Sequence, residues 1–275
     1  MALSIHKLSK TFKLGTENLT VFVDLTFEMD KGETLAFTGP AGSGKTTLIN
    51  ILGCLDSPSS GSYLIGDTNP LDFNRKKTSR FRRDYIGFLF QDSFLLPQLT
   101  VLENVLVPCM ATGLPLKTDV NFAKSLLDQL GLSNFMDFLP SRLTTEQKQR
   151  AAAARALIKR PSLLLADEPT ACLIPRSASV FLDDVLAVQK ECGSMFILAT
   201  DSPALAQKMN RTATIVETRF VFTGRRDAPQ DAPFARPAPA QPVQPAALSW
   251  EEVEEDSDQL EQSASNVEEF RRRFQ

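Results

Sequence analysis

Short apolar runs alternate with amphipathic stretches over residues 1–224, and their lengths are typical of strands and helices. The apolar runs that predict strands are Thr20–Phe27, Thr34–Phe37, Tyr85–Phe90, Leu163–Ala166 and Met195–Ala199. Helix-period patterns at Val120–Leu130 and Gln147–Ile158 predict helices. The alternation predicts an α/β domain. No run of eighteen or more apolar residues occurs, so we predict no membrane-spanning helix.

The composition changes beyond residue 224. Residues 225–248 are rich in Pro, Ala and Gln, which predicts a semi-extended linker. Residues 249–275 contain nine acidic residues and three arginines, a net charge of −6. This acidic tail is either a solvated disordered segment or a short amphipathic helix that docks on a partner through Val267, Phe270 and Phe274. Arg271–Arg273 also allows contact with an anionic membrane surface.

Composition adds little beyond this outline. A hydrophobic content of 43% and a charged content of 23% are those of a soluble globular protein, and the N-terminus has no secretory pattern. The net charge of −3 gives no indication of nucleic-acid binding. Four cysteines are scattered without metal-ligand spacing, so we expect reduced thiols that mainly fill the core.

The first motif with chemistry matches GxxxxGK[ST] and lies between a strand-like run and a helix-like run, as a phosphate-binding loop requires. Its glycines let backbone amides close around an anion at a helix start. Lys45 should reach the outer phosphates of a nucleotide, and the Thr46 hydroxyl should bind Mg²⁺. The candidate nucleotide-binding residues are Gly39, Pro40, Ala41, Gly42, Ser43, Gly44, Lys45, Thr46 and Thr47.

A second motif supports the first. The apolar run Leu163–Ala166 ends in two acids, and a carboxylate at the end of such a strand lies beside the phosphate loop in this class of sheet. Asp167 is the candidate Mg²⁺ ligand, directly or through water. Glu168 is the candidate catalytic residue, because its carboxylate could polarise the water that attacks the γ-phosphate.

Together these motifs resemble an ATP-binding-cassette (ABC) ATPase subunit. The chain is most similar to the lipoprotein-release and macrolide-export branch, which also includes the cell-division ATPase. The resemblance covers residues 3–224 and rests on Gly39–Thr47, Leu52–Gly61, Ile86–Gln91, Leu95–Val105 and Ala166–Thr170. It implies a P-loop NTPase fold with a RecA-like core, an antiparallel β subdomain and a helical subdomain at about 92–160, all within residues 1–224.

The resemblance also implies cofactors and partners. ATP and Mg²⁺ are the expected cofactors, with Phe12 under the adenine and Gln91 near Mg²⁺. From the sequence alone, Phe12 is equally well an ordinary core residue. The expected partners are an integral-membrane permease, contacted by Phe94–Pro108, and a second ATPase subunit in a homodimer or heterodimer. The implied location is the cytoplasmic face of the inner membrane.

The chain departs from the family pattern at three places. Leu143–Gln147 reads Leu-Thr-Thr-Glu-Gln where the family has the signature Leu-Ser-Gly-Gly-Gln, which one subunit offers to its partner's nucleotide. Asp201 occupies the position of the switch histidine. Ile174 replaces an aspartate in the next loop, and Pro175 removes an amide donor.

These losses leave two functional hypotheses. In the first, the chain is an ATPase that drives a membrane transporter with weak or partner-dependent hydrolysis. In the second, it is a non-hydrolysing ATP-binding scaffold or regulator of a membrane complex. Glu146 weighs against normal closure, because a carboxylate facing a phosphate at 4 Å is expected to repel it by up to about 4 kcal/mol.

Overall fold

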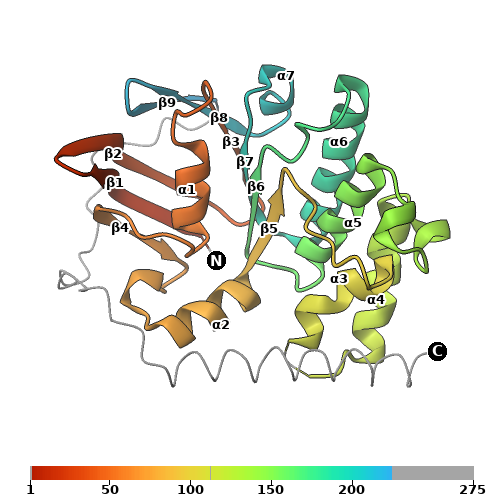
Figure 1. The fold of residues 1–275 in the computed structure, drawn as a ribbon. Helices are drawn as coiled ribbons and strands as arrows, with labels where there is room; N and C mark the ends of the chain where they lie inside the picture. The colour runs from red at the N-terminus through yellow and green to blue at the C-terminus, as the bar shows by residue number, and fades with distance from the viewer. Residues whose placement is uncertain (1, 112, 225–275) are drawn as a thin grey trace.

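The computed structural model describes residues 2–111 and 113–224, and these residues form the α/β arrangement that the sequence predicts. Residues 225–275 lie outside the described part, and with them the predicted linker, the acidic tail and its possible amphipathic helix. The described part divides into two sheets and a group of helices (Figure 1).

The larger sheet has six strands in the order β5-β6-β7-β3-β8-β9. Neighbouring strands from β5 to β8 are parallel, and β9 pairs antiparallel with β8. The bounds are Thr34–Thr38 for β3, Ile86–Phe90 for β5, Leu163–Asp167 for β6, Met195–Ala199 for β7, Arg211–Val216 for β8 and Arg219–Gly224 for β9. The five parallel strands therefore end at one edge of the sheet.

The smaller sheet is antiparallel, with the order β2-β1-β4. Its strands are β1 at Leu3–Leu14, β2 at Glu17–Met29 and β4 at Ser60–Ile65. In Figure 1 this sheet and α1 lie on one side of the larger sheet, and α3, α4, α5 and α6 lie on the other.

The helices are α1 at Lys45–Leu52, α2 at Arg75–Tyr85, α3 at Val101–Met110, α4 at Lys117–Gln129, α5 at Thr145–Leu157, α6 at Pro175–Cys192 and α7 at Pro203–Ala206. Single 3₁₀ turns occur at Pro70–Asp72, Ser133–Phe135 and Pro140–Arg142. Helices α3, α4 and α5 all fall between β5 and β6 along the chain, within the range predicted for a helical subdomain.

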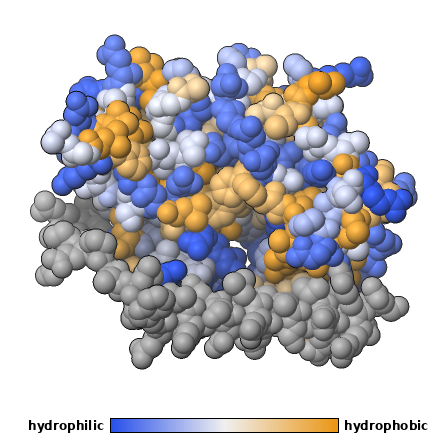
Figure 2. Space-filling model, viewed as in Figure 1, coloured by the Kyte–Doolittle hydropathy of each residue, from blue (hydrophilic) through white to orange (hydrophobic). Residues whose placement is uncertain are grey.

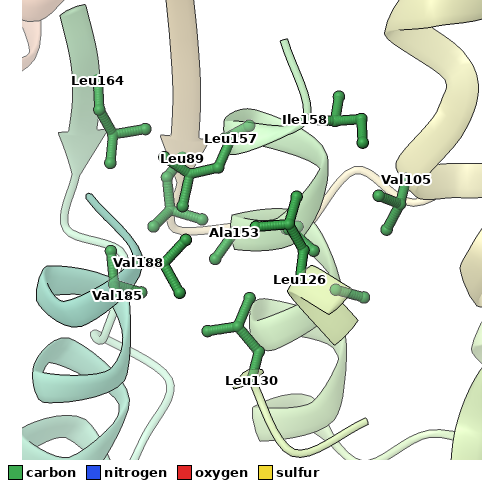
Figure 3. Close-up of a cluster of buried hydrophobic side chains, with 14 of the residues drawn as sticks. Leu89, Val105, Leu126, Leu130, Ala153, Leu157, Ile158, Leu164, Val185 and Val188 are labelled. Carbon is green, nitrogen blue, oxygen red and sulfur yellow. The ribbon is translucent and has the colours of Figure 1, made fainter. Parts of the chain in front are cut away.

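The larger sheet is buried on both faces, which explains why its strands are almost wholly apolar. Within β6, Leu163 and Leu165 face α1 and the smaller sheet, while Leu164 and Ala166 face α3–α6. Figure 3 shows Leu164 and Leu89 beside Leu157 of α5 and Val185 of α6. Two hydrophobic clusters, one on each face, hold the central strands in place, and the functional loops follow those strands.

The predicted strands and helices are confirmed, with shifts at their ends. The sequence predicts a strand that begins at Tyr85, whereas Tyr85 is the last residue of α2. Its ring stacks on that of Phe81, with 5.0 Å between the centroids. The expectation that the cysteines mainly fill the core is confirmed for three of the four. Cys109 is buried in one hydrophobic cluster, and Cys192 and Cys54 are partly buried and pack against the two clusters. Cys172 is exposed in the loop that follows β6.

Candidate functional site

The loop between β3 and α1 wraps tightly, and two of its glycines cannot be replaced without strain. Gly44 has a φ of 100°, and a Cβ there would lie 2.3 Å from Cγ1 of Val21. Gly39 has a φ of 152°, and its Cβ would lie 2.8 Å from Oγ of Ser43. Both conformations disfavour a side chain, so the glycine pattern of the motif has a direct steric cause.

Lys45 is the first residue of α1, and its side chain folds back into this loop. It is 7% exposed, and its ammonium donates hydrogen bonds to the carbonyl oxygens of Gly39 at 2.7 Å and Pro40 at 3.2 Å. Its Nζ also lies 3.6 Å from Oε1 of Glu168. A cation thus sits at the centre of the loop, within reach of an anion that enters it.

Asp167 closes β6 beside this loop, as predicted. Burial raises the pKa of its carboxyl group, while a hydrogen bond with Thr46 and the charge of Lys45 act in the opposite direction. Its Oδ1 atom is buried and has no hydrogen-bond partner among the described residues. An unpartnered carboxylate oxygen beside a threonine hydroxyl is the donor set that Mg²⁺ prefers, so the residues present fit this cation.

Glu168 follows directly, with a left-handed backbone of φ 45° that turns its side chain toward Lys45. This conformation costs roughly 1 to 3 kcal/mol for a residue with a Cβ, which is typical of functional sites. Burial is the largest cause of the raised pKa of Glu168; the charge of Asp201 acts in the same direction, while the hydrogen bond from the Asp201 amide and the interactions with Lys45 lower the pKa. The amide of Asp201 donates to Oε2 of Glu168 at 3.3 Å, so the residue in the switch position lies against the candidate catalytic carboxylate.

A cavity of about 310 Å³ adjoins the outer side of the loop. It is lined by Pro40–Ser43, by Leu19–Val21 of β2 and by the turn between β8 and β9. Phe12 pairs directly with Leu19 across the two strands, and its ring is 36% exposed. Phe12 is therefore not a core residue, and it lies on the strand next to one that lines this cavity, with Nζ of Lys10 4.6 Å from its ring centroid.

The buried Ser43 hydroxyl also lacks a hydrogen-bond partner among the described residues. Buried polar atoms are normally satisfied, and each exception calls for an explanation. Two such atoms, Ser43 Oγ and Asp167 Oδ1, occur in the two motifs that meet at this site. Bound phosphate and its cation would supply their partners, so the loop fits both groups.

Gln149 of α5 is a site residue that sequence reasoning missed. Its side chain is 2% exposed, and its amide nitrogen lies within hydrogen-bond distance of three carbonyl oxygens: Phe90 at 2.8 Å, Gln91 at 3.0 Å and Pro169 at 2.7 Å. These carbonyls belong to the last residue of β5 and to the loops that follow β5 and β6. Gln149 thus joins α5 to the loop that contains Gln91 and to the loop after Glu168. The residues on either side of Gln149 in the sequence do not indicate this role.

Replacing Gln149 by alanine is expected to lower the free energy of unfolding by about 1 to 3 kcal/mol, because the carbonyls of Phe90, Gln91 and Pro169 lose the amide donor that they share. Chemical denaturation of the full chain measures the change. Gln129→Ala is the matched control, since that exposed side chain bonds to Glu191 and should cost at most about 0.5 kcal/mol. Equal stability of the two variants would show that Gln149 does not tie these loops together.

The signature-like segment forms a regular helix start. The Thr144 hydroxyl accepts a hydrogen bond from the Gln147 amide at 3.2 Å, and the Gln147 side chain accepts one from the Thr144 amide at 2.9 Å. This capping box satisfies the backbone amides of Thr144 and Gln147 within the chain. Thr144 and Thr145 are exposed, so the segment is accessible to a second molecule.

The expected repulsion from Glu146 needs correction. Its carboxylate pairs with Arg150 one turn along α5, with both Nε and Nη2 of Arg150 at 3.1 Å from Oε1. Arg150 in turn donates to Asp184 at 2.6 Å. The charge of Glu146 is therefore directed along the helix and partly neutralised, and about 4 kcal/mol of repulsion is too large for this arrangement.

The remaining predicted residues lie at the rim of the site. Gln91 is exposed, and its backbone carbonyl accepts a hydrogen bond from the side chain of Gln149. Ile174 is 69% exposed and precedes α6, whose first residue is Pro175. Within the described ranges, no group of three or more His, Cys, Asp or Glu could hold a metal alone, and no helix is long and apolar enough to cross a membrane.

Comparison with known proteins agrees with this geometry. The family model described as ABC transporter matches residues 22–171. The chain is 41% identical over 223 residues to the lipoprotein-releasing system ATP-binding protein LolD 1 of Rhodopirellula baltica, covering 81% of this chain and 97% of that protein. It is 37% identical over 225 residues to the uncharacterized ABC transporter ATP-binding protein YvrO of Bacillus subtilis, covering 82% and 98%.

A solved structure supports the same assignment. The fold matches the dimeric post-hydrolysis state of the ATP-binding cassette MJ0796 bound to ADP and Pi with a TM-score of 0.73 and 30% identity, over 82% of this chain and 99% of that one. The sheet order, the phosphate loop and the sequence relatives all point to one family. The chain belongs to the ABC transporter family and is an ATP-binding subunit of its lipoprotein-release and macrolide-export branch.

Proposed function

We propose that this subunit binds Mg-ATP in the loop at Gly39–Thr47 and couples the nucleotide to a membrane permease. The observation that carries the proposal is the convergence of Lys45, Thr46, Asp167 and Glu168 at the carboxyl edge of the parallel strands. Lys45 would exchange its two loop carbonyls for phosphate oxygens. Thr46 and Asp167 would hold Mg²⁺, with Gln91 near the cation, and Phe12 would stack under the adenine.

A surface groove of about 600 Å³ supports the permease as partner. It lies between α2, β5, α3 and α5, and Figure 2 shows hydrophobic residues over the middle of this face above a hollow between α2 and α3. Phe94, which is 63% exposed, and Pro108 both line it, and Arg155 bonds to the carbonyls of Ser93 and Phe94 at 2.6 Å each. A permease segment docked here would contact the backbone that leads to Gln91.

The relatives suggest what the complex does and where. LolD 1 carries the name of a lipoprotein-releasing system, so we propose that the permease partner releases lipoproteins or exports a related cargo. The subunit would then sit on the cytoplasmic face of the cell membrane. MJ0796 is described as a dimer, which supports pairing of this chain with a second copy or with another ABC subunit.

We further propose that hydrolysis is weak or depends on the partner subunit. The site that this chain would use for its own nucleotide keeps Lys45, Asp167 and Glu168, but Asp201 places a negative charge against Glu168. The capping box at Thr144 supplies no glycine amides for close approach to a partner's γ-phosphate. A non-hydrolysing ATP-binding scaffold is the alternative, favoured by the same two departures.

Replacing Glu168 by glutamine is expected to abolish phosphate release while leaving Mg-ATP binding within about threefold, because glutamine keeps the size of the side chain but is a poor base. Phosphate release should be measured on the chain alone and with its co-purified partners.

Because burial and the charge of Asp201 raise the pKa of Glu168, activity should fall with decreasing pH from a higher pH than an ordinary glutamate would give. Asp201→Asn removes one of these causes and should move that fall to lower pH.

Glu191→Gln is the control, since this exposed glutamate lies at the end of α6. It should leave phosphate release and binding unchanged. Tight Mg-ATP retention without any release that depends on Glu168, with and without partners, would favour the scaffold function. Absence of nucleotide binding would reject both forms of the proposal.

A further inference from the structure

Helix α2 presents a strongly basic surface that the proposed site does not use. Six of its eleven residues are Lys or Arg, against a single acid, Asp84. Phe81 is the residue that the helix buries, and it packs against Phe73 at 5.6 Å between ring centroids. The basic residues of the first two turns are exposed: Arg75, Lys76, Lys77 and Arg80. One buried apolar residue thus holds a helix whose exposed residues are mainly basic, although Asp67, Asp72 and Asp84 line the same surface pocket as Lys77 and Arg80.

The basic surface continues to the rim of the groove. Arg82 and Arg83 line that groove together with Phe88 and Phe94, so a ligand on α2 would lie at its edge. Arg82 is fixed by a hydrogen bond to the carbonyl of Cys54 at 3.1 Å, and Arg83 pairs with Asp84 at 2.9 Å. The exposed basic residues at the start of α2, which are Arg75, Lys76, Lys77 and Arg80, add four further positive charges beside them.

The same chain contains a segment of opposite charge. Residues 251–261 include seven Asp or Glu and no Lys or Arg. The tail as a whole, at 249–275, has a net charge of −6, so the rest of the chain carries +3. Blocks of like charge are typical interaction tails, and complementary potential selects their partners.

The linker is long enough for the acidic block 251–261 to reach α2. Residues 225–248 would span about 74 Å at the roughly 3.1 Å per residue of a proline-rich extended chain. A domain of residues 1–224 has a diameter of about 45 Å, from the usual scaling of the radius of gyration. Every part of the surface is thus within reach, and tethering raises the effective concentration to the millimolar range.

We propose that the acidic block 251–261 docks in cis on the basic surface of α2 at Arg75, Lys76, Lys77 and Arg80. The contact is electrostatic and reversible. It places the tail beside the groove, where it would compete with any other anionic ligand of α2. The inference rests on charge and chain length and not on nucleotide binding, so either proposal can fail without the other.

The tail carries its own reporter, because Trp250 is the single tryptophan of the chain and precedes the acidic block directly. Fluorescence anisotropy and acrylamide quenching of Trp250 in the full chain measure docking. At about 10 mM salt the Debye length is about 30 Å, and at about 1 M it is about 3 Å. We expect higher anisotropy and weaker quenching at low salt, with both effects lost at high salt.

Neutralising α2 should release the tail. The variant with Arg75, Lys76, Lys77 and Arg80 all changed to glutamine is expected to lose at least half of the salt-sensitive anisotropy. Glutamine is a good helix former, so α2 should persist. The matched control changes four exposed lysines elsewhere to glutamine, with the same change in net charge, and should retain the signal. Those lysines are Lys13, Lys31, Lys117 and Lys124.

A second variant neutralises part of the acidic block and leaves residues 1–224 unchanged. Changing Glu251, Glu252, Glu254 and Glu255 to glutamine should lower the low-salt anisotropy as far as the α2 variant does. Anisotropy that is independent of salt, or an α2 variant that behaves like its lysine control, would overturn the proposal. So would a signal that falls on dilution, which would indicate docking between copies.

A membrane surface is the competing occupant of α2. Vesicles of phosphatidylglycerol should bind the tail variant more tightly than the unmodified chain if the tail normally covers α2. Equal vesicle binding by the two, lost in both when α2 is neutralised, would identify α2 as a free lipid-binding surface and reject docking of the tail.

Discussion

Replacing Lys45 by alanine is expected to lower the affinity for Mg-ATP by ~30- to ~1,000-fold. The ammonium is 7% exposed and lies inside the phosphate loop, so its hydrogen bonds to phosphate would be charge-assisted and poorly screened. Removing one partner of such a buried pair typically costs about 2 to 4 kcal/mol, and each 1.4 kcal/mol is about tenfold in affinity. Isothermal titration calorimetry with Mg-ATP measures the loss.

Two further variants separate the causes of that loss. Lys45→Ala also leaves Glu168 without the cation that lies 3.6 Å from its carboxylate, so part of the effect could come from repulsion of phosphate by Glu168. Combining Lys45→Ala with Glu168→Gln removes that repulsion, and we expect at most about a tenfold recovery. Lys124→Ala, an exposed change on α4, should leave affinity unchanged. Full affinity of Lys45→Ala would reject the nucleotide site as assigned.

Restoring the family pattern at the three positions Thr145→Gly, Glu146→Gly and Asp201→His is expected to raise phosphate release by at least about 100-fold. Glycine amides give a partner's γ-phosphate the close backbone approach that the side chains of Thr145 and Glu146 obstruct. Histidine replaces a negative charge beside Glu168 with a hydrogen-bond donor. Removing one comparable donor from an active site typically costs about 10² to 10³ in rate, so restoring several should give a gain of this size.

The structure indicates that the charge of Glu146 contributes little to this gain. Glu146 already pairs with Arg150, so Glu146→Gln alone should change the rate by at most about threefold. Arg150 keeps its bond to Asp184 in the triple variant, and Thr144 keeps its place as the cap of α5. Two glycines in the first turn should therefore cost at most about 2 kcal/mol of stability.

Phosphate release of the triple variant should be compared with that of the triple variant carrying Glu168→Gln, which should be inactive. An unmodified chain that already hydrolyses ATP as fast as the repaired one would show that the departures at Thr145, Glu146 and Asp201 are functionally neutral. It would also remove the reason to propose weak or partner-dependent hydrolysis.

The candidate site could be located from the sequence because its parts are local in the chain. The motif at Gly39–Thr46 has the strand before it and the helix after it encoded in the same twenty residues. The pair Asp167 and Glu168 follows one buried strand directly. Parallel strands end at a common edge, so an apolar run followed by acids was enough to place these carboxylates near the loop.

Side-chain partners were not accessible in this way. Gln149 contacts carbonyls 58, 59 and 20 positions away, and its neighbours Lys148 and Arg150 do not share its environment. The direction of Glu146 also depends on α6, because Arg150 is held by Asp184 of that helix. The exposure of Phe12 depends on how β1 and β2 project past the phosphate loop, which neither strand pattern contains.

The sequence by itself determined the α/β class, the family, the phosphate loop, the acids that follow β6 and the departures at Leu143–Gln147 and Asp201. The class, the loop and the acids lie in contiguous residues whose conformation follows from sterics, periodicity and strand direction, whereas the family and the departures follow from the resemblance of the motifs to those of ABC ATPases. Only the tertiary structure decided that Glu146 pairs with Arg150, that Gln149 connects two loops to α5 and that the cations of α2 border the groove. Those facts depend on contacts between segments distant in the chain, which packing of the two hydrophobic clusters brings together.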